Sequence, residues 1–178
     1  MNQEVGLADW LERSPGPVGI VFTDIVDSTL LLHRLKTMNF TLVLGAYKSR
    51  AVAVAARWDG RLVDSVGDEL FAVFRTATDA YRFAADLFGD PGHPELRVRA
   101  GVHFGSVHAY EGHLVGRNVH LGARIMDQGR GHELWVSDAA KTALESESAS
   151  VAAAIAWLAS VECEFKGIPD PQRVWRAA

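Results

Sequence analysis

Two short apolar runs, each next to an aspartate, constrain the fold of this chain most strongly. Residues 18–22 run into Asp24, and residues 70–74 follow Asp68 after a turn that contains Gly67. Short β-rich runs bounded by Gly or Pro are typical of buried strands, so each aspartate is expected at the rim of a sheet. Two carboxylates that converge at such a rim suit a hard divalent cation such as Mg²⁺, which commonly takes phosphates as further ligands. The sequence therefore predicts a metal site at Asp24 and Asp68.

Length and composition indicate one folded domain. The chain has 178 residues, of which 48% are hydrophobic, and this suits a single core. We take residues 1–16 as a leader and residues 17–178 as the domain. The net charge of −4 gives no basic surface for nucleic acid. The single cysteine, Cys163, cannot form an internal disulfide and favours the cytoplasm. The start of the chain lacks a signal peptide, and no apolar run is long enough to span a membrane.

Strand and helix patterns alternate along the chain. Strands are predicted at 17–24, 61–65, 69–75, 96–110 with a break near Gly105, 133–136, 161–166 and 173–176. Helices are predicted at 29–36, 39–58, 77–88, 119–127 and 145–159, with a short one after Ser137. Asp27 or Ser28 is expected to cap the first helix, and Thr76 the third. The order strand, helix, hairpin, helix, strand indicates an α+β sandwich with a ferredoxin-like centre.

Five short segments also occur in a characteristic order: FTDIVDST at 22–29, GDE at 67–69, RAGVH at 99–103, VHLGAR at 119–124 and FKGIP at 165–169. In this order they resemble the catalytic domain of the class III adenylate and guanylate cyclases, and the resemblance runs from about residue 18 to residue 175. It implies a bacterial, stand-alone domain with the ferredoxin-like α/β sandwich of that family. It also implies a reaction in which the 3′-hydroxyl of a nucleoside triphosphate attacks its own α-phosphate and expels pyrophosphate.

The resemblance assigns roles to the residues around the two aspartates. Asp24 and Asp68, together with the backbone carbonyl of Ile25, would bind two divalent cations, Mg²⁺ or Mn²⁺. Asp27 stands where the family often has glycine, so its carboxylate is expected to cap the helix or face solvent. Glu69 is expected on the opposite face of the strand and is not predicted as a ligand. Amides at the start of the helix would bind the β- and γ-phosphates. They are those of Val26, Ser28 and Thr29.

Three basic residues match positions that contact phosphate in the family. Arg99 resembles a phosphate-binding arginine, and Lys166 matches a lysine that reaches the phosphates from a flexible segment. Arg124 falls at the position of the arginine that stabilises the charge on the α-phosphate in the transition state. Each could instead be a solvated surface residue, but the surrounding motifs favour the functional interpretation.

Three positions depart from the adenylate cyclase pattern. Asp64 stands where a lysine reads adenine, His113 where an aspartate assists it, and His120 where an asparagine orients the ribose or the transition state. Asp64 could accept from the adenine amine or from N1–H and N2–H of guanine. Alternatively, Asp64 and His113 could bind each other and leave the base unspecified. His120 keeps a hydrogen-bond donor near Arg124.

In the family, one subunit supplies the metal carboxylates and the other supplies the base-reading and transition-state residues. This chain carries both sets, so the resemblance implies a head-to-tail homodimer with two composite sites. The expected function is a cytoplasmic nucleotide cyclase, with ATP as the default substrate. Two alternatives stay open. One is a cyclase that prefers GTP or a pyrimidine triphosphate, and the other is a weak or inactive cyclase-homology module that dimerises and binds nucleotide for regulation.

Overall fold

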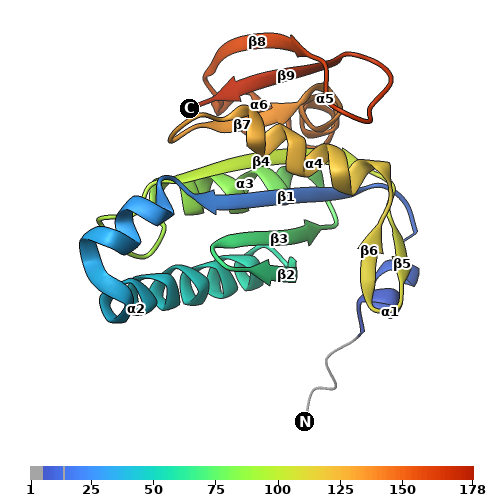
Figure 1. The fold of residues 1–178 in the computed structure, drawn as a ribbon. Helices are drawn as coiled ribbons and strands as arrows, with labels where there is room; N and C mark the ends of the chain where they lie inside the picture. The colour runs from blue at the N-terminus through green and yellow to red at the C-terminus, as the bar shows by residue number, and fades with distance from the viewer. Residues whose placement is uncertain (1–5, 14) are drawn as a thin grey trace.

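A seven-stranded sheet forms the centre of the computed structural model, which describes residues 6–13 and 15–178. The strand order is β2-β3-β1-β4-β7-β9-β8, and β5 pairs only with β6 (Figure 1). The strands are β1 (Val18–Ile25), β2 (Arg61–Val66), β3 (Glu69–Phe74), β4 (Val98–Gly105), β5 (His108–Tyr110), β6 (His113–Val115), β7 (Leu134–Ser137), β8 (Trp157–Cys163) and β9 (Gln172–Ala177). The helices are α1 (Leu7–Glu12), α2 (Ser28–Arg57), α3 (Ala77–Gly89), α4 (Arg117–Gln128), α5 (Asp138–Glu147) and α6 (Ala149–Ala154).

Strand β1 lies between β3 and β4 and runs antiparallel to both. Of its eight residues, only Asp24 is not fully buried, as expected for an apolar strand whose carboxylate emerges at the rim. The predicted hairpin of β2 and β3 is confirmed. The mixed sheet, with the helices packed on it, has the predicted α+β sandwich architecture.

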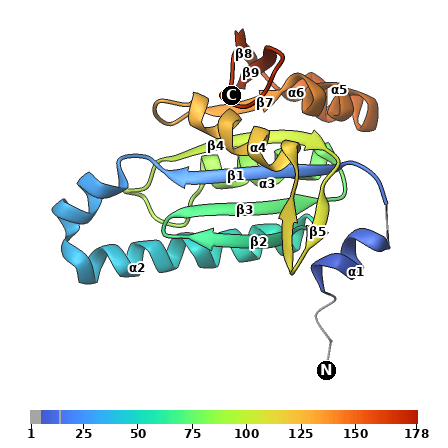
Figure 2. The ribbon, with the colours of Figure 1, turned by 45° about the vertical axis from the view of Figure 1, so that its right-hand side comes forward.

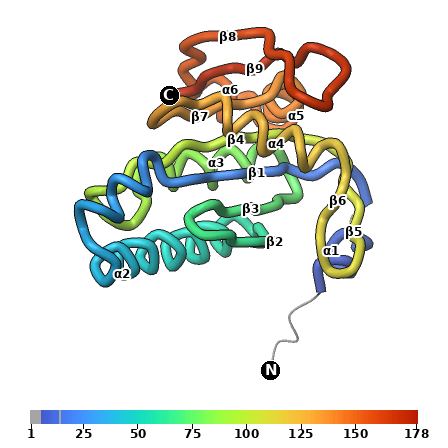
Figure 3. Tube along the Cα trace, viewed as in Figure 1, coloured from blue at the N-terminus to red at the C-terminus, as the bar shows by residue number. Residues whose placement is uncertain are grey.

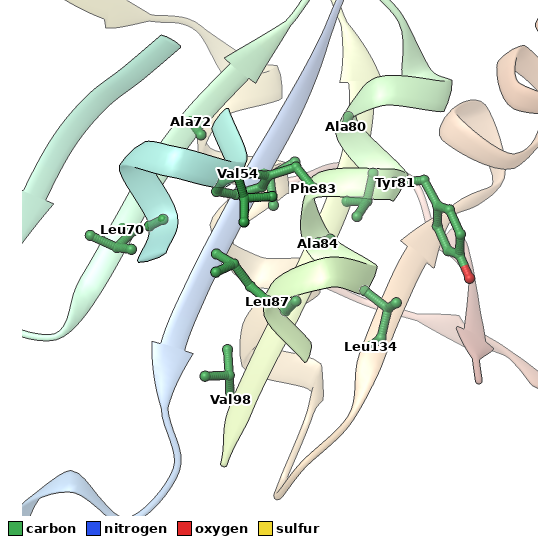
Figure 4. Close-up of a cluster of buried hydrophobic side chains, with 14 of the residues drawn as sticks. Val54, Leu70, Ala72, Ala80, Tyr81, Phe83, Ala84, Leu87, Val98 and Leu134 are labelled. Carbon is green, nitrogen blue, oxygen red and sulfur yellow. The ribbon is translucent and has the colours of Figure 1, made fainter. Parts of the chain in front are cut away.

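The two faces of the sheet bury different helices. Helices α2, α3 and α5 pack on one face, where the largest apolar cluster includes Tyr47, Phe83 and Leu87; Figure 4 shows part of this cluster. Helix α4 packs on the other face, against Phe22 and its neighbours. Its close approach depends on Gly101, because a Cβ atom at that position would lie 2.3 Å from the backbone nitrogen of Met126.

Helix α2 consists of two helical segments that meet at Lys36, and Figure 3 shows the change of direction. The backbone at Lys36 has φ 62° and ψ 161°, which interrupts the helix. The two helices predicted at 29–36 and 39–58 are therefore confirmed. The predicted cap of α3 is also confirmed, because Thr76 Oγ1 accepts a hydrogen bond from the Asp79 amide at 3.0 Å.

The prediction of a helix over residues 145–159 is wrong beyond Ala154. Helices α5 and α6 end at Glu147 and Ala154, and β8 begins at Trp157. Pairing with β9 decides the conformation here, since Trp157 lies opposite Ala177 in the sheet. The rings of Trp157 and Trp175 also pack edge to face, with their centroids 6.1 Å apart. Local helix propensity in the alanine-rich stretch gives way to this long-range pairing.

Helix α1 forms within the predicted leader and lies beside the β5–β6 hairpin, which stands out from the main sheet (Figure 2). Trp10 anchors this helix: its side chain is buried, and the Arg75 guanidinium sits 3.7 Å from the ring centroid. Residues 1–5 and 14 of the predicted leader lie outside the described residues. Among the helices that the structure describes, none is long and apolar enough to cross a membrane.

Candidate functional site

A cleft of about 360 Å³ opens where β1 ends. One wall is the start of α2, and the other is the loop after α4. Asp24 and Arg99 lie between these walls. The remaining lining residues are Ile25, Val26, Asp27, Ser28, Thr29, Leu30, Gly129, Arg130 and Gly131.

Asp24 and Arg99 form an ion pair inside this cleft. They face each other across β1 and β4, and Asp24 Oδ2 accepts from Arg99 Nη2 at 2.7 Å and from Nε at 3.0 Å. Their side chains are 16% and 27% exposed, so the pair is only partly screened by water. Burial raises the pKa of Asp24, the hydrogen bond from Arg99 opposes this, and the charge of nearby Asp68 raises it further.

The proximity of Asp24 and Asp68 agrees with the pattern seen in the sequence. Asp68 lies in the turn between β2 and β3, close enough for its charge to raise the pKa of Asp24. Two half-buried carboxylates that repel each other gain from a shared cation. Their oxygen atoms, with Ile25 on the same cleft, suit Mg²⁺ or Mn²⁺.

The start of α2 leaves backbone amides open to the cleft. Asp27 occupies the N-cap position with φ 54°, but its exposed side chain makes no capping hydrogen bond, so it faces solvent. Ser28 and Thr29 follow, with the unbonded amides of a first helical turn. The amide of Val26 is different, because it donates to the Arg97 carbonyl at 2.8 Å. Anion binding through amides is therefore available at Ser28 and Thr29 but not at Val26.

Glu133 fixes the opposite wall of the cleft. Its carboxylate accepts from the Arg130 amide at 3.3 Å, from Trp135 Nε1 at 3.1 Å and from Arg176 Nη1 at 2.9 Å. Burial alone would raise the pKa of Glu133, but the hydrogen bonds from Trp135 and Arg176 outweigh it and lower the pKa. The sequence analysis did not identify Glu133, because no local sequence pattern indicates that its side chain binds the Arg130 amide.

Arg124 lies on α4, and its side chain is 48% exposed. It pairs with Asp127 at 3.7 Å, and Asp127 also lies 3.7 Å from Arg99. One carboxylate therefore connects the predicted transition-state arginine with the arginine of the cleft. The sequence analysis did not single out Asp127.

A second pocket of about 220 Å³ brings together Asp64 and His113, which are 49 positions apart in the chain. Phe22 and Phe71 line it and stack on each other, with ring centroids 4.5 Å apart. Within the described residues no hydrogen bond or ion pair joins Asp64 to His113, and Asp64 Oδ1 instead accepts from the Ser65 amide at 2.7 Å.

Glu69 also lines this second pocket, contrary to the expectation that it points away from the site. Burial raises the pKa of Glu69, and so does the charge of nearby Asp24. The expectation failed because Asp68 belongs to the turn, not to the strand. Thr23 pairs with Leu70, so extending the register by one residue sets Glu69 beside Asp24.

Four predicted site residues line neither pocket: Asp68 and Arg124, described above, and His120 and Lys166. His120 is exposed on α4, and Lys166 is exposed in the loop between β8 and β9, seen beside those strands in Figure 1. Neither lines the 360 Å³ cleft or the 220 Å³ pocket. The exposed side chains of His120 and Lys166 are therefore accessible to another molecule.

Sequence comparison finds relatives that match part of the chain. An uncharacterised protein of Mycobacterium tuberculosis is 34% identical over 110 residues, which are 61% of this chain and 29% of that protein. An adenylate cyclase of Streptomyces coelicolor is 30% identical over 112 residues, again 61% and 29%. The chain thus spans less than a third of the length of these relatives. No family model matches it.

Structural comparison gives matches over nearly the whole chain. An adenylate cyclase structure from Trypanosoma brucei has a TM-score of 0.76 at 20% identity, covering 92% of this chain and 90% of the other. The adenylyl cyclase CyaB of P. aeruginosa has a TM-score of 0.75 at 18% identity, and the match covers 92% of this chain and 94% of that one. A guanylate cyclase domain of Catenaria anguillulae in complex with GTP has a TM-score of 0.71 at 21% identity, and the match covers 92% of this chain and 96% of that one. At these identities the likeness establishes the fold.

Proposed function

We propose that this chain, which has the fold of the catalytic domains of class III adenylyl and guanylyl cyclases, is itself a nucleotide cyclase. The observation that carries the proposal is the proximity of Asp68 to Asp24, which itself lies in a cleft with Arg99 and the uncapped start of α2. A fold alone is compatible with many functions, whereas this combination suits a cation bound to a triphosphate.

Asp24 and Asp68, with the Ile25 carbonyl, would hold two divalent cations, Mg²⁺ or Mn²⁺. When bound, these ions would lower the pKa of the 3′-hydroxyl and neutralise charge on the leaving pyrophosphate. Among the described residues no group of three His, Cys, Asp or Glu side chains suits a metal ion. The ions would therefore take part of their coordination from water and from the substrate phosphates.

The residues around the cations would position the triphosphate for an internal displacement. The amides of Ser28 and Thr29 would bind the terminal phosphates, and Arg99 would exchange its contact with Asp24 for a phosphate oxygen. The 3′ oxygen forms a bond to the α-phosphorus as the bond to the pyrophosphate oxygen breaks, and the hydroxyl proton leaves to solvent. Arg124 would stabilise the charge that gathers on the α-phosphate, and His120 would donate beside it.

The proposal includes a second copy of the chain. Asp64 and His113 would contact the base, and Lys166 the phosphates, of a substrate whose cations are held by the partner. This arrangement gives exposed Arg124, His120 and Lys166 a role that the single chain does not offer. ATP is the substrate that the name of the Streptomyces coelicolor relative suggests, but none of the residues that would bind the cations or phosphates reads the base.

A turnover assay tests the proposal. The purified chain is incubated with Mn²⁺ and, separately, with ATP, GTP, CTP and UTP, and cyclic nucleotide and pyrophosphate are measured. We expect one purine triphosphate to give both products in equal amounts. Asp24→Asn should lower the rate by about 10²–10³-fold, comparable to losing one electrostatic stabiliser of a transition state. The matched variant Asp9→Asn, at an exposed aspartate of α1 that lines neither pocket, should retain the rate.

A second candidate function has different expectations. The departures at Asp64, His113 and His120 favour a regulatory module that binds nucleotide without turnover. Such a module would bind a nucleotide in equilibrium dialysis but release no pyrophosphate from any of the four substrates. That result in a confirmed dimer would replace the cyclase proposal.

A further inference from the structure

The 220 Å³ pocket combines an aromatic wall with three polar side chains. Phe22 and Phe71 form the wall, with rings stacked at an interplanar angle of 7°. Asp64, Glu69 and His113 supply the polar groups. A flat aromatic wall accepts any nucleobase by stacking, so the hydrogen-bonding groups decide which base is bound.

The three polar groups have capacity left for a ligand. Among the described residues, no hydrogen bond or ion pair engages the side chains of Glu69 or His113. Asp64 uses one oxygen atom for the Ser65 amide and keeps the other. A ligand that covers the pocket removes water from both carboxylates, so it must supply N–H groups to them or leave them unsatisfied at a cost.

The nucleobases differ in the number of donors that they present. The Watson–Crick edge of guanine offers two donors, N1–H and N2–H, and one acceptor, O6. Two carboxylates and one imidazole N–H are the complementary set. The same edge of adenine offers one donor and one acceptor, which satisfies one carboxylate and leaves the second without a partner. Cytosine and uracil also present a single donor on this edge.

We propose that Asp64, Glu69 and His113 together select guanine over adenine in this pocket, with Glu69 as a specificity-determining residue. The inference rests on the proposed function, because the base in question is that of the triphosphate to be cyclised. Glu69 supplies the second acceptor, and without it Asp64 and His113 would offer only the one acceptor and one donor that adenine satisfies. The inference runs against the name of the Streptomyces coelicolor relative, an adenylate cyclase, so experiment can contradict it directly.

The test is the ratio of kcat/KM for GTP to that for ATP with Mn²⁺, in the wild-type chain, in Glu69→Gln and in Glu111→Gln. Glutamine keeps the size of the side chain, removes its charge and replaces one acceptor oxygen by an NH₂ donor, so its remaining oxygen accepts an N–H group more weakly. Glu111 lies in the exposed turn between β5 and β6 and does not line the pocket, so Glu111→Gln is the matched control. We expect wild type and Glu111→Gln to prefer GTP by about tenfold or more, and Glu69→Gln to lose about tenfold of that ratio. Any effect on cation binding alters both rates and cancels in the ratio.

The outcomes separate this inference from the function on which it rests. A preference of the wild type for ATP, or a ratio that Glu69→Gln leaves unchanged, would overturn guanine selection while leaving a cyclase. Absence of turnover with either nucleotide would instead contradict the cyclase function. In that case the affinities of GDP and ADP are measured in the same three chains, by displacement of a bound fluorescent GTP analogue. This measurement tests base selection by the pocket without requiring turnover. Tighter displacement by GDP that is lost in Glu69→Gln is the expected result, and equal displacement would overturn the inference.

Discussion

His103 is a buried histidine of β4 and joins three elements through two hydrogen bonds. Its side chain is 4% exposed, with Nδ1 2.8 Å from Ser137 Oγ and Nε2 3.0 Å from Asn118 Oδ1. Asn118 donates its amide hydrogen to the Ser106 carbonyl, which turns its oxygen towards His103. His103 therefore carries a proton on Nε2 and accepts on Nδ1, so the neutral imidazole satisfies both contacts.

This environment predicts a pH-dependent stability. Burial lowers the pKa of His103 below its ordinary value of 6.5, so the unfolded chain takes up a proton at a higher pH than the folded chain. The contribution of His103 is complete above pH 6.5 and declines as the pH falls towards the folded-state pKa. The decline is up to about 1.4 kcal/mol per pH unit within that window. Urea unfolding between pH 5 and 8 measures it.

Two variants isolate the contribution of His103 from that of other titrating groups. His103→Gln should lower stability at pH 7.5 and flatten the slope below pH 6.5. His33→Gln changes an exposed histidine of α2 and should leave both unchanged. Equal slopes in wild type and His103→Gln would contradict the prediction.

At the scale of single residues, the sequence predicted the groups that end strands and missed those that depend on register. Asp24 was predictable because the apolar run before it defines a strand and its rim. Glu69 was not, because its position beside Asp24 follows from the pairing of Thr23 with Leu70, which no local pattern specifies. Glu133 was missed for a similar reason, since two of its partners, Arg130 and Arg176, come from a loop and from β9.

At the scale of elements, α5 stabilises the start of α3. Glu147, at the end of α5, accepts hydrogen bonds from the amides of Ala77 and Thr78 at 3.0 and 2.8 Å, and from Thr78 Oγ1 at 2.8 Å. A carboxylate at this position satisfies amides that the helix leaves unpaired and interacts favourably with the helix dipole. The helix that underlies the sheet is therefore held by a residue 70 positions further along the chain.

Removal of this tertiary cap should destabilise the fold. We expect Glu147→Ala to lower the free energy of unfolding by about 1–2 kcal/mol, the usual cost of losing an N-terminal cap. Glu145→Ala removes a glutamate of the same helix that forms only a surface ion pair with Lys141, and its effect should stay below about 0.5 kcal/mol. Chemical denaturation of both variants gives the comparison. Equal losses would show that Glu147 does not act as a cap.

The elements themselves were largely predictable, because apolar periodicity and capping residues are local signals. Thr76 marked the start of α3 correctly, and the interval between the two predicted helices placed the break in α2. The error at Trp157 arose where local and long-range preferences conflict. Alanine-rich sequence favours a helix, but the free edge of β9 offers backbone partners that only the assembled sheet provides.

At the scale of the whole molecule, the groups that the proposed reaction needs are divided between two pockets of the chain. The cleft has carboxylates, Arg99 and open amides but lacks an aromatic surface for a base. The second pocket has that surface but lacks a cationic group for phosphates. In the proposed homodimer a second copy would bring the pocket of one chain to the cleft of the other.

Mixing two inactive variants tests this arrangement. Asp24→Asn removes the cation site of one half, and Arg124→Ala removes the transition-state contact of the other, so each homodimer should be inactive. A mixed dimer would have one intact site of two, and random exchange makes half of the dimers mixed. About a quarter of the wild-type activity should therefore return. A mixture of Asp24→Asn with Asp68→Asn is the matched control, because both changes fall in the same half and no pairing restores a site. Recovery in neither mixture, despite subunit exchange confirmed by co-purification of differently tagged chains, would place all the catalytic groups within one chain.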